Sequence, residues 1–419
     1  MSSTQNNHYI VTNFAYGTGP YLRTTDLAIA VNDELEKSGR ERCRILVPWV
    51  YGDRQKTVML EEFAAHNEKH PGEILLDAEL GALLRSVFYT GTRSYEDALR
   101  QWVATYRDVS QAAHEHLAGT LKAETLRGER VACSGRDIIA ELSRSPRIRY
   151  DIAPSYFTSF AYVGEILERA QEEEGIAVDR ELLKKGITAA QWVEENHRFH
   201  CIAWPATFAY MDSYVHSIIS SVIPAKAGIH KKKKVLDPHL RGDDKLRRYP
   251  AEIIVPPIAP PPVANDEKLE PGIFVTITGI PGLERLYADA VRLGLKLYSN
   301  DTAAVPGSIW MSPHVIPNKN IAFQFARAGW SSIWLSMISG TPLVVPDFDP
   351  HDDPEIFFNN CSVKKLGLGM IYRGEPLEEI LQRSDELKKS TARMKDEVLH
   401  RFGTLDGNRA CAELFAKDF

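Results

Sequence analysis

Residues 323–360 gather the side chains that are best suited to hold an anionic ligand. Gly329 follows an apolar run, and two hydroxyl residues, Ser331 and Ser332, come shortly after it. A serine after a glycine is typical of the N-cap of a helix, where N–H groups and the positive end of the helix dipole can bind a phosphate. This spacing predicts a phosphate-binding turn.

A loop rich in carboxylates comes after the next strand. The sequence predicts a helix over 332–339 that ends at Gly340, and then a buried strand over 342–345. Carboxylates just beyond the carboxyl end of a strand face the ligand-binding edge of a parallel sheet, where they can accept hydrogen bonds from sugar hydroxyls. We therefore expect sugar contacts from this loop, whose acidic residues are Asp347, Asp349, Asp352, Asp353 and Glu355.

A second glycine-containing loop, at residues 16–20, lies near the N-terminus. It follows a predicted strand over 9–14, and Thr24 or Thr25 is expected to cap the helix that comes next. Its two glycines let the backbone approach a ligand closely. Asp26, at the start of that helix, is the nearest carboxylate. It could serve as a general base or pair with the helix dipole.

The same loop is a poor dinucleotide fingerprint. Leu22 occupies the place of the third glycine, and the second predicted strand, over 45–50, ends without an acidic residue for a ribose. The sequence therefore argues against a nucleotide-dependent dehydrogenase.

Strands and helices alternate along the chain, which predicts parallel sheets. The C-terminal region opens with a strand over 273–279 that ends at Gly279, followed by a helix over 283–293. A chain of 419 residues is long enough for two cored domains. We expect an α/β protein with two Rossmann-like domains, each with a mainly parallel sheet, separated by a cleft. The expected division is an N-terminal domain over 1–250, a proline-rich linker over 251–268, a C-terminal domain over 269–402 and a C-terminal helix over 403–419.

Residues 222–245 break the composition of the N-terminal region. They contain an unbroken run of four lysines and show no periodicity. The segment resembles the translated form of a palindromic repeat that is scattered through bacterial genomes. We interpret it as an insertion in a surface loop, where added length costs little closure entropy.

Composition limits the class of partner. The net charge is −6, and binding along a phosphate backbone would normally need a basic surface, so we expect no nucleic-acid partner. The five cysteines are far apart and form no C-x-x-C, which predicts neither a zinc site nor a disulfide framework and fits a reducing cytoplasm. No signal peptide and no membrane span are apparent. We expect a cytoplasmic protein, with peripheral contact at the inner membrane left open.

The pattern around Gly329 resembles a known donor-binding segment. The order Gly-Trp-x-Ser, short helix, Gly-x-Pro, acidic loop and Asn is similar, over about forty residues, to that of inverting GT-B glycosyltransferases of the MurG-like and UDP-glycosyltransferase groups. The resemblance implies that the C-terminal domain binds a nucleotide sugar and that the N-terminal domain lies on the acceptor side. It assigns the diphosphate to Arg327, Gly329, Ser331 and Ser332. It assigns the sugar to Glu355, with Asp352 and Asp353 as substitutes.

The resemblance extends to two glycine loops. The loop at 16–20 is similar to the GGTGGH loop of MurG-like proteins, which places Gly17, Thr18, Gly19 and Tyr21 on the acceptor side. Gly279 begins a turn that corresponds to a loop near the diphosphate.

The chain also departs from the family pattern. Leu335 replaces the glutamate that holds the ribose hydroxyls, and Tyr21 replaces a histidine. The two glutamates of retaining enzymes are replaced by Arg327 and Leu335, which argues against that subgroup.

These observations predict a hexosyltransferase that is inverting and independent of metal, with no cofactor beyond the nucleotide-sugar co-substrate and with Asp26 as the candidate base. The acceptor is a sugar, a lipid-linked compound or a small molecule. Two alternatives stay open: a GT-B-type sugar-nucleotide epimerase, and a non-catalytic nucleotide-binding protein.

Overall fold

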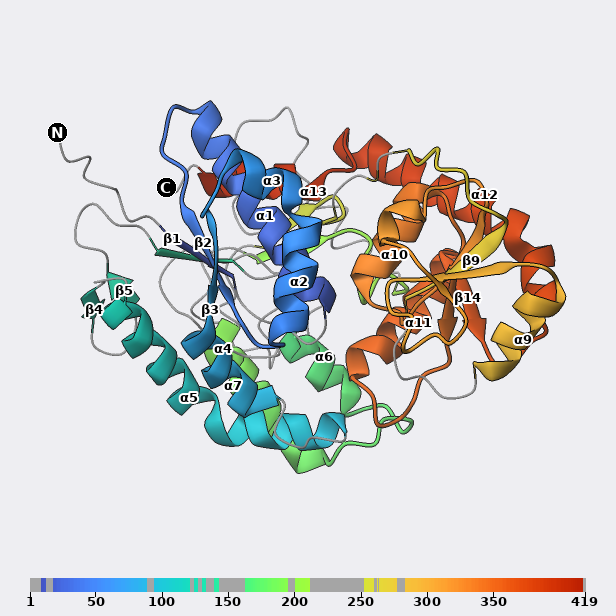
Figure 1. Ribbon diagram of the computed structural model, residues 1–419. Coiled ribbons are helices and arrows are strands. Elements are labelled where there is room, and N and C mark those ends of the chain that lie inside the picture. The colour runs from blue at the N-terminus through green and yellow to red at the C-terminus, as the bar shows by residue number, and fades with distance from the viewer. Residues whose placement is uncertain are drawn as a thin grey trace. The chain divides into compact units, whose positions relative to one another are not determined.

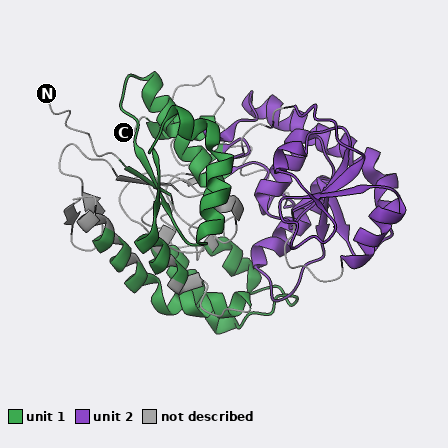
Figure 2. Cartoon of the chain, in the orientation of Figure 1, with its two compact units in different colours: residues 1–202, 221–254, 409–419 green, residues 203–220, 255–408 purple. Residues whose placement is uncertain are grey.

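The computed structural model describes residues 9–12, 18–88, 94–120, 124–126, 130–132, 139–142, 163–194, 200–211, 252–259, 262, 264–276 and 283–416. Gly17, Gly279 and the segment 222–245 lie outside these residues. The chain divides into two compact units, drawn in two colours in Figure 2. The first comprises residues 1–202, 221–254 and 409–419, and the second comprises residues 203–220 and 255–408.

The first unit is built on a four-stranded sheet in the order β3-β2-β1-β6, in which every pairing is parallel. The strands are β1 (Tyr9–Thr12), β2 (Arg44–Pro48), β3 (Ile74–Asp77) and β6 (Ile139–Leu142). Parallel neighbours need a crossover, and helices supply it. They are α1 (Thr18–Lys37), α2 (Asp53–Glu62), α3 (Ala64–Lys69), α4 (Ala78–Phe88) and α5 (Tyr95–Thr120).

Smaller elements complete this unit (Figure 1). They are the hairpin of β4 (Glu124–Leu126) and β5 (Arg130–Ala132), and the helices α6 (Val163–Ala170) and α7 (Arg180–Glu194). Strands β7 (His200–Ala203) and β8 (Glu252–Val255) form a two-stranded pair. The chain passes from the first unit to the second within each of them, after residue 202 in β7 and after residue 254 in β8.

Helix α1 begins earlier than the sequence indicates. It starts at Thr18, so neither Thr24 nor Thr25 is its cap. Both threonines are buried inside the helix, and the Thr25 hydroxyl donates to the Tyr21 carbonyl 2.8 Å away, one turn earlier. The threonines therefore pack in the interior of the unit, and the helix continues through them.

The second unit has a six-stranded parallel sheet in the order β11-β10-β9-β12-β13-β14. The strands are β9 (Gly272–Val275), β10 (Lys296–Ser299), β11 (Ile309–Trp310), β12 (Ile321–Phe325), β13 (Leu343–Pro346) and β14 (Gly369–Tyr372). The chain builds outward from β9 on one side and then returns to β12 to build the other side. Ligands of open α/β sheets bind at such a reversal, outside the carboxyl ends of the two central strands.

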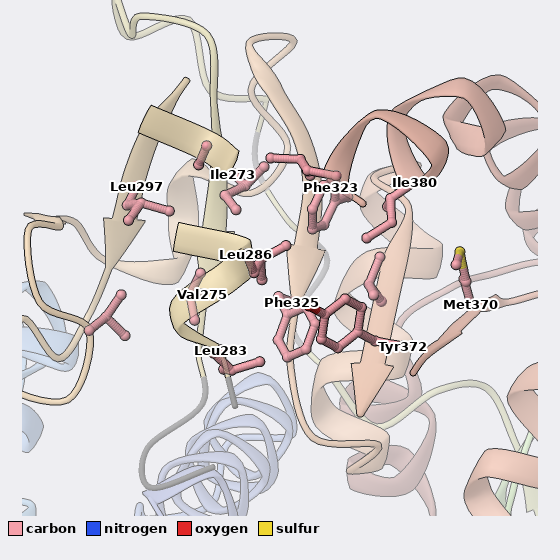
Figure 3. Close-up of a cluster of buried hydrophobic side chains, with 14 of the residues drawn as sticks. Ile273, Val275, Leu283, Leu286, Leu297, Phe323, Phe325, Met370, Tyr372 and Ile380 are labelled. Atoms are coloured by element: carbon pink, nitrogen blue, oxygen red, sulfur yellow. The ribbon is translucent and has the colours of Figure 1, made fainter. Parts of the chain in front are cut away.

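Helices cover both faces of this sheet. On one face, α9 (Glu284–Arg292) and α12 (Leu377–Phe402) pack onto alternate strand residues, and Figure 3 shows Leu286 and Ile380 directed toward Ile273, Phe323 and Phe325. The opposite face carries Phe274 and Tyr298. The remaining elements of this unit are α10 (Trp330–Ser339), α11 (Pro354–Leu366) and the 3-10 turn η1 (Pro313–Val315), whereas α13 (Gly407–Phe415) belongs to the first unit from residue 409 on. Burial on both faces explains the continuous apolar runs of the strands.

Candidate functional site

The turn between β12 and α10 lies at the point where the strand order reverses. Gly329 itself is the N-cap of α10, with φ −81° and ψ 142°, so the expected serine N-cap is wrong. Its carbonyl accepts from the amides of Ser332 and Ile333, at 3.0 and 3.1 Å. Ser331 and Ser332 therefore belong to the first turn of the helix, where N–H groups and the positive dipole end are concentrated.

Gly329 faces open space. A Cβ built on it would meet nothing within 4 Å, and its negative φ is available to any residue. Gly340, at the other end of the helix, differs because its φ of 75° favours glycine. Since neither backbone conformation nor packing requires a glycine at 329, its effect is to leave the front of the helix start open.

Arg327 and Asp352 form a two-point ion pair. The Arg327 Nε lies 3.0 Å from Asp352 Oδ2, and Nη2 bonds to Oδ1. Both side chains are about one-third exposed, at 35% and 33%. Two residues that the sequence assigns to different parts of a donor, the diphosphate and the sugar, are thus brought together. An incoming diphosphate would compete with Asp352 for the guanidinium.

Asp353 and Glu355 stand at the start of α11. The Asp353 carboxylate caps this helix by accepting from the Glu355 amide at 2.9 Å. The Glu355 carboxylate accepts from the Asn359 side-chain amide at 3.0 Å. Asp353 is therefore used in ordering the helix start, whereas Glu355 is held by a side chain that also contacts the turn at 328–330.

Asn359 is a residue whose role the sequence did not reveal. Its Nδ2 donates to the Ala328 carbonyl at 2.7 Å, and its Oδ1 accepts from the Trp330 indole N–H at 2.8 Å. Both side chains are completely buried. The sequence pattern contains Gly-Trp and, further along, Asn in a fixed order, and this order was the available signal for the role of Asn359. The order alone does not show that the side chains touch.

Residues 203–211 belong to the second unit, although some forty residues of sequence separate them from its main part, which begins at residue 255. The Thr207 hydroxyl also accepts from the Trp330 indole, at 3.2 Å, and the Pro205 carbonyl accepts from Trp334 Nε1 at 2.9 Å. The Ser362 hydroxyl of α11 donates to the Thr207 carbonyl at 2.8 Å. This segment therefore ties α10 to α11, the two helices whose first turns carry the candidate ligands.

Three other residues of this unit bear on the candidate site, namely Trp310, His314 and Leu335. Trp310 ends β11 with its side chain 55% exposed, which is unusual for an indole. His314 pairs with Glu267 at 2.8 Å and is exposed. Leu335 packs against the apolar cluster that contains Phe274 and Val315. Of these, Trp310 offers a flat apolar surface to a ligand, and the sequence analysis missed it.

The candidate base lies in the first unit. Asp26 is paired with Arg23 at 2.5 Å, and Arg23 also contacts Glu62 of α2 at 2.7 Å. Burial raises the pKa of the Asp26 carboxyl to about 6 from its ordinary 3.8, against the attraction of Arg23 and with added repulsion from Glu62. A carboxylate that titrates near neutrality is suited to proton transfer.

The acceptor-side residues fall at the beginning of α1. Thr18 and Gly19 lie in its first turn, and Tyr21 is 2% exposed with its ring 5.8 Å from that of Tyr51. The position at which the resembled family has a histidine is thus a core position here.

The described residues contain neither a candidate membrane span nor a candidate metal cluster. No helix among them is long and apolar enough to cross a bilayer. No group of three or more His, Cys, Asp and Glu side chains among them is arranged to hold a metal ion.

Among the comparisons with known proteins, the one with solved structures indicates the fold. No protein-family model matches the sequence, and no curated protein matches it. Solved structures do match over almost the whole chain. A UDP-glucosyltransferase from Polygonum tinctorium that glucosylates indoxyl has 10% identity and a TM-score of 0.57, with 99% of each chain covered.

Two further neighbours are similar. CalG4, the calicheamicin glycosyltransferase, has 14% identity and a TM-score of 0.52, with 98% of each chain covered. UGT89C1 of Arabidopsis thaliana, solved with UDP-L-rhamnose, has 12% identity and a TM-score of 0.54, with 99% of each chain covered. Together with the parallel sheets, these matches show that the chain has the two-domain α/β fold of GT-B type.

Proposed function

We propose that this GT-B chain is a glycosyltransferase that moves a sugar from a nucleotide-sugar donor to an acceptor hydroxyl. The observation that carries the proposal is the open turn before α10. It combines a helix start, a glycine that leaves space in front of it and the Arg327 guanidinium, all outside the carboxyl end of β12 at the reversal of the sheet. Doubly wound sheets bind nucleotides at this place.

The diphosphate occupies this turn. The amides of the first turn and the hydroxyls of Ser331 and Ser332 donate to the phosphate oxygens, and Arg327 supplies the positive charge. These groups take up the charge that develops on the departing nucleoside diphosphate, a role that a metal ion fills in other enzymes. Metal-independent transfer is therefore part of the proposal.

The two ends of the donor are recognised on either side of the turn. Glu355 accepts hydrogen bonds from the sugar hydroxyls at the start of α11. At the other side, the exposed indole of Trp310 stacks on the base, because a flat apolar ring can cover a base of any identity. Two of the three neighbours described above are named for UDP or solved with a UDP-sugar, which supports a uridine donor.

Asp26 is the proposed general base. Its ionised form takes the proton of the acceptor hydroxyl as this oxygen attacks the anomeric carbon, and the nucleoside diphosphate leaves from the opposite side. This single displacement inverts the anomeric centre. Its pKa of about 6 means that the carboxylate is mostly ionised at pH 7.

A non-catalytic role is the second candidate, favoured by Tyr21. A buried tyrosine fills the position that corresponds to the family's histidine, so the acceptor side has lost one expected polar group. Such a protein would bind the nucleotide and transfer nothing.

The two candidates are separated in two steps. A ligand that binds only the folded state raises the melting temperature, so we expect UDP to stabilise the protein and Arg327→Ala to remove the shift. An assay with UDP-sugars and a panel of acceptors then tests transfer. If no nucleotide raises the melting temperature, both candidate functions are wrong. If a nucleotide raises it but no sugar is transferred, the protein is a non-catalytic nucleotide-binding protein.

A further inference from the structure

The side chain of Asn359 joins the two halves of the proposed donor site. It lies in the second turn of α11 and is completely buried. One N–H of its amide reaches the Ala328 carbonyl at 2.7 Å, and the other reaches Glu355 Oε1 at 3.0 Å. Its oxygen accepts from Trp330 at 2.8 Å.

The chemistry of the three partners fixes the orientation of this amide. An indole N–H can only donate, and a backbone carbonyl can only accept, so Oδ1 must face Trp330 and Nδ2 must face Ala328. The second N–H then points to Glu355. No other side chain of similar size offers two donors and one acceptor in one rigid plane.

The contacts of this amide lie on both sides of Gly329. Ala328 and Trp330 are the immediate neighbours of Gly329 in the chain, so Asn359 holds the backbone carbonyl before Gly329 and the side chain of the residue after it. The Trp330 indole is held from the other direction by Thr207. Glu355 and the turn before α10 are therefore connected through one amide.

We propose that Asn359 is a positioning residue that fixes the phosphate-binding turn and Glu355 relative to each other, so that the diphosphate and the sugar of a nucleotide sugar are recognised as one unit. The inference rests on the proposed function for its ligand, but the positioning of the turn does not depend on any ligand.

Hydrogen exchange tests the positioning without a nucleotide. In Asn359→Leu, which keeps the branched shape of the side chain and removes all three bonds, the amides of 329–333 should exchange about tenfold faster or more, because the buried hydrogen bonds to Ala328 and Trp330, at the start of the segment, are lost. The amides of 361–366 in the same helix should keep their rates. Unchanged exchange at 329–333 in a folded variant overturns the inference.

The matched control is Asn360→Leu. Asn360 is the next residue of α11, is also buried, and bonds to the Pro346 carbonyl at 3.2 Å, away from the turn. This variant should leave the exchange of 329–333 at the wild-type rate. Equal acceleration in both variants means that Asn359 only stabilises α11, which overturns the positioning role.

A milder change guards against a failure to fold. Trp330→Phe keeps the ring in place and removes only the indole N–H, so Asn359 loses one of its three bonds. We expect a smaller acceleration at 329–333 than in Asn359→Leu. No acceleration contradicts the inference.

Binding then tests the coupling. Glu355→Gln should weaken UDP-sugar binding and leave UDP binding unchanged, since it removes charge from the sugar side only. Asn359→Leu should weaken both, with UDP affinity falling about tenfold. If Asn359→Leu changes only the UDP-sugar affinity, the turn is not positioned by Asn359. If the wild type binds neither ligand, the proposed function fails, and the exchange data still decide the positioning role.

Discussion

The pairing of Arg327 with Asp352 leads to an unusual expectation, because removing an acidic residue from the proposed donor site should strengthen nucleotide binding. In the structure two guanidinium nitrogens of Arg327 bond to this carboxylate. A diphosphate that binds at the turn has to share or displace it. Asp352→Asn keeps the shape of the side chain, removes its charge and leaves Arg327 more available to the phosphates.

Two terms set the size of the effect. The first is the ion pair, which for side chains about one-third exposed is worth up to about 1 kcal/mol after screening by solvent. The second is repulsion between Asp352 and the bound diphosphate. Two unit charges ~6 Å apart interact by about 3 kcal/mol at an effective dielectric constant of ~20, and exposure and salt reduce this severalfold. The sum is about 1–2 kcal/mol, which corresponds to roughly 5- to 30-fold tighter binding of UDP.

Isothermal titration of wild type, Asp352→Asn and Arg327→Ala with UDP measures this directly. UDP is preferable to a UDP-sugar because any loss of sugar contacts from Asp352 would mask the gain. Arg327→Ala should weaken binding, and in the double variant the gain from Asp352→Asn should shrink to the part that comes from direct repulsion, since the ion-pair term needs Arg327. The gain of Asp352→Asn should also shrink as salt is raised.

The result that refutes this reasoning is weaker UDP binding by Asp352→Asn with a normal melting temperature. It would mean that Asp352 orients Arg327 for the phosphate instead of competing with it.

Four further outcomes follow from the site. Gly329→Ala should change the free energy of unfolding by less than about 1 kcal/mol, because the new methyl group meets open space. The same change should weaken UDP binding at least tenfold, and calorimetry measures both the unfolding and the binding. Trp310→Ala should cost about 1–3 kcal/mol of UDP binding by loss of stacking and leave the melting temperature unchanged. Asp353→Ala should lower stability by about 1 kcal/mol as a lost helix cap, with UDP affinity unaltered in titration. For Asp26, folding raises the pKa to about 6, so the carboxyl stabilises the folded state most below about pH 4, and this contribution is lost as pH rises from about 4 to 6. Asp26→Asn should therefore raise the melting temperature at pH 8 but not at pH 4, while transfer, which in wild type rises with pH through about 6, should fall at least about a hundredfold.

The fold was accessible to sequence reasoning because its signals are local. Apolar runs between helical periods indicated β2, β9 and β13 and the parallel arrangement. The helix of 283–293 is confirmed as α9, within one residue at each end. Where a boundary depends on burial, the local signal misled: Thr24 and Thr25 read as caps, but they are interior residues of α1.

For the candidate site, the sequence indicated which residue types take part but not which of their side chains contact one another. The residue types at Arg327 and Asp352 and their place beside strand ends were visible in the sequence. That these two side chains neutralise each other, and that Asn359 holds the turn from 31 residues away, are long-range facts. A pattern of spacing cannot state which of several polar groups face one another. The roles assigned to Gly17 and Gly279 stay predictions, since both lie outside the described residues.

The membership of residues 203–211 in the second unit bears on how this protein could be recombined with others. A donor-binding half cut out as a single piece beginning after residue 254 would leave Trp330 without Thr207, Trp334 without its carbonyl acceptor and Ser362 without the Thr207 carbonyl. The Trp334 indole and the Ser362 hydroxyl would lose these partners, and Trp330 would be left with Asn359, in an interior where each lost hydrogen bond is costly. Chimeras that exchange donor specificity should therefore transplant two stretches of sequence, and the shorter of them, far upstream, decides whether the larger one folds.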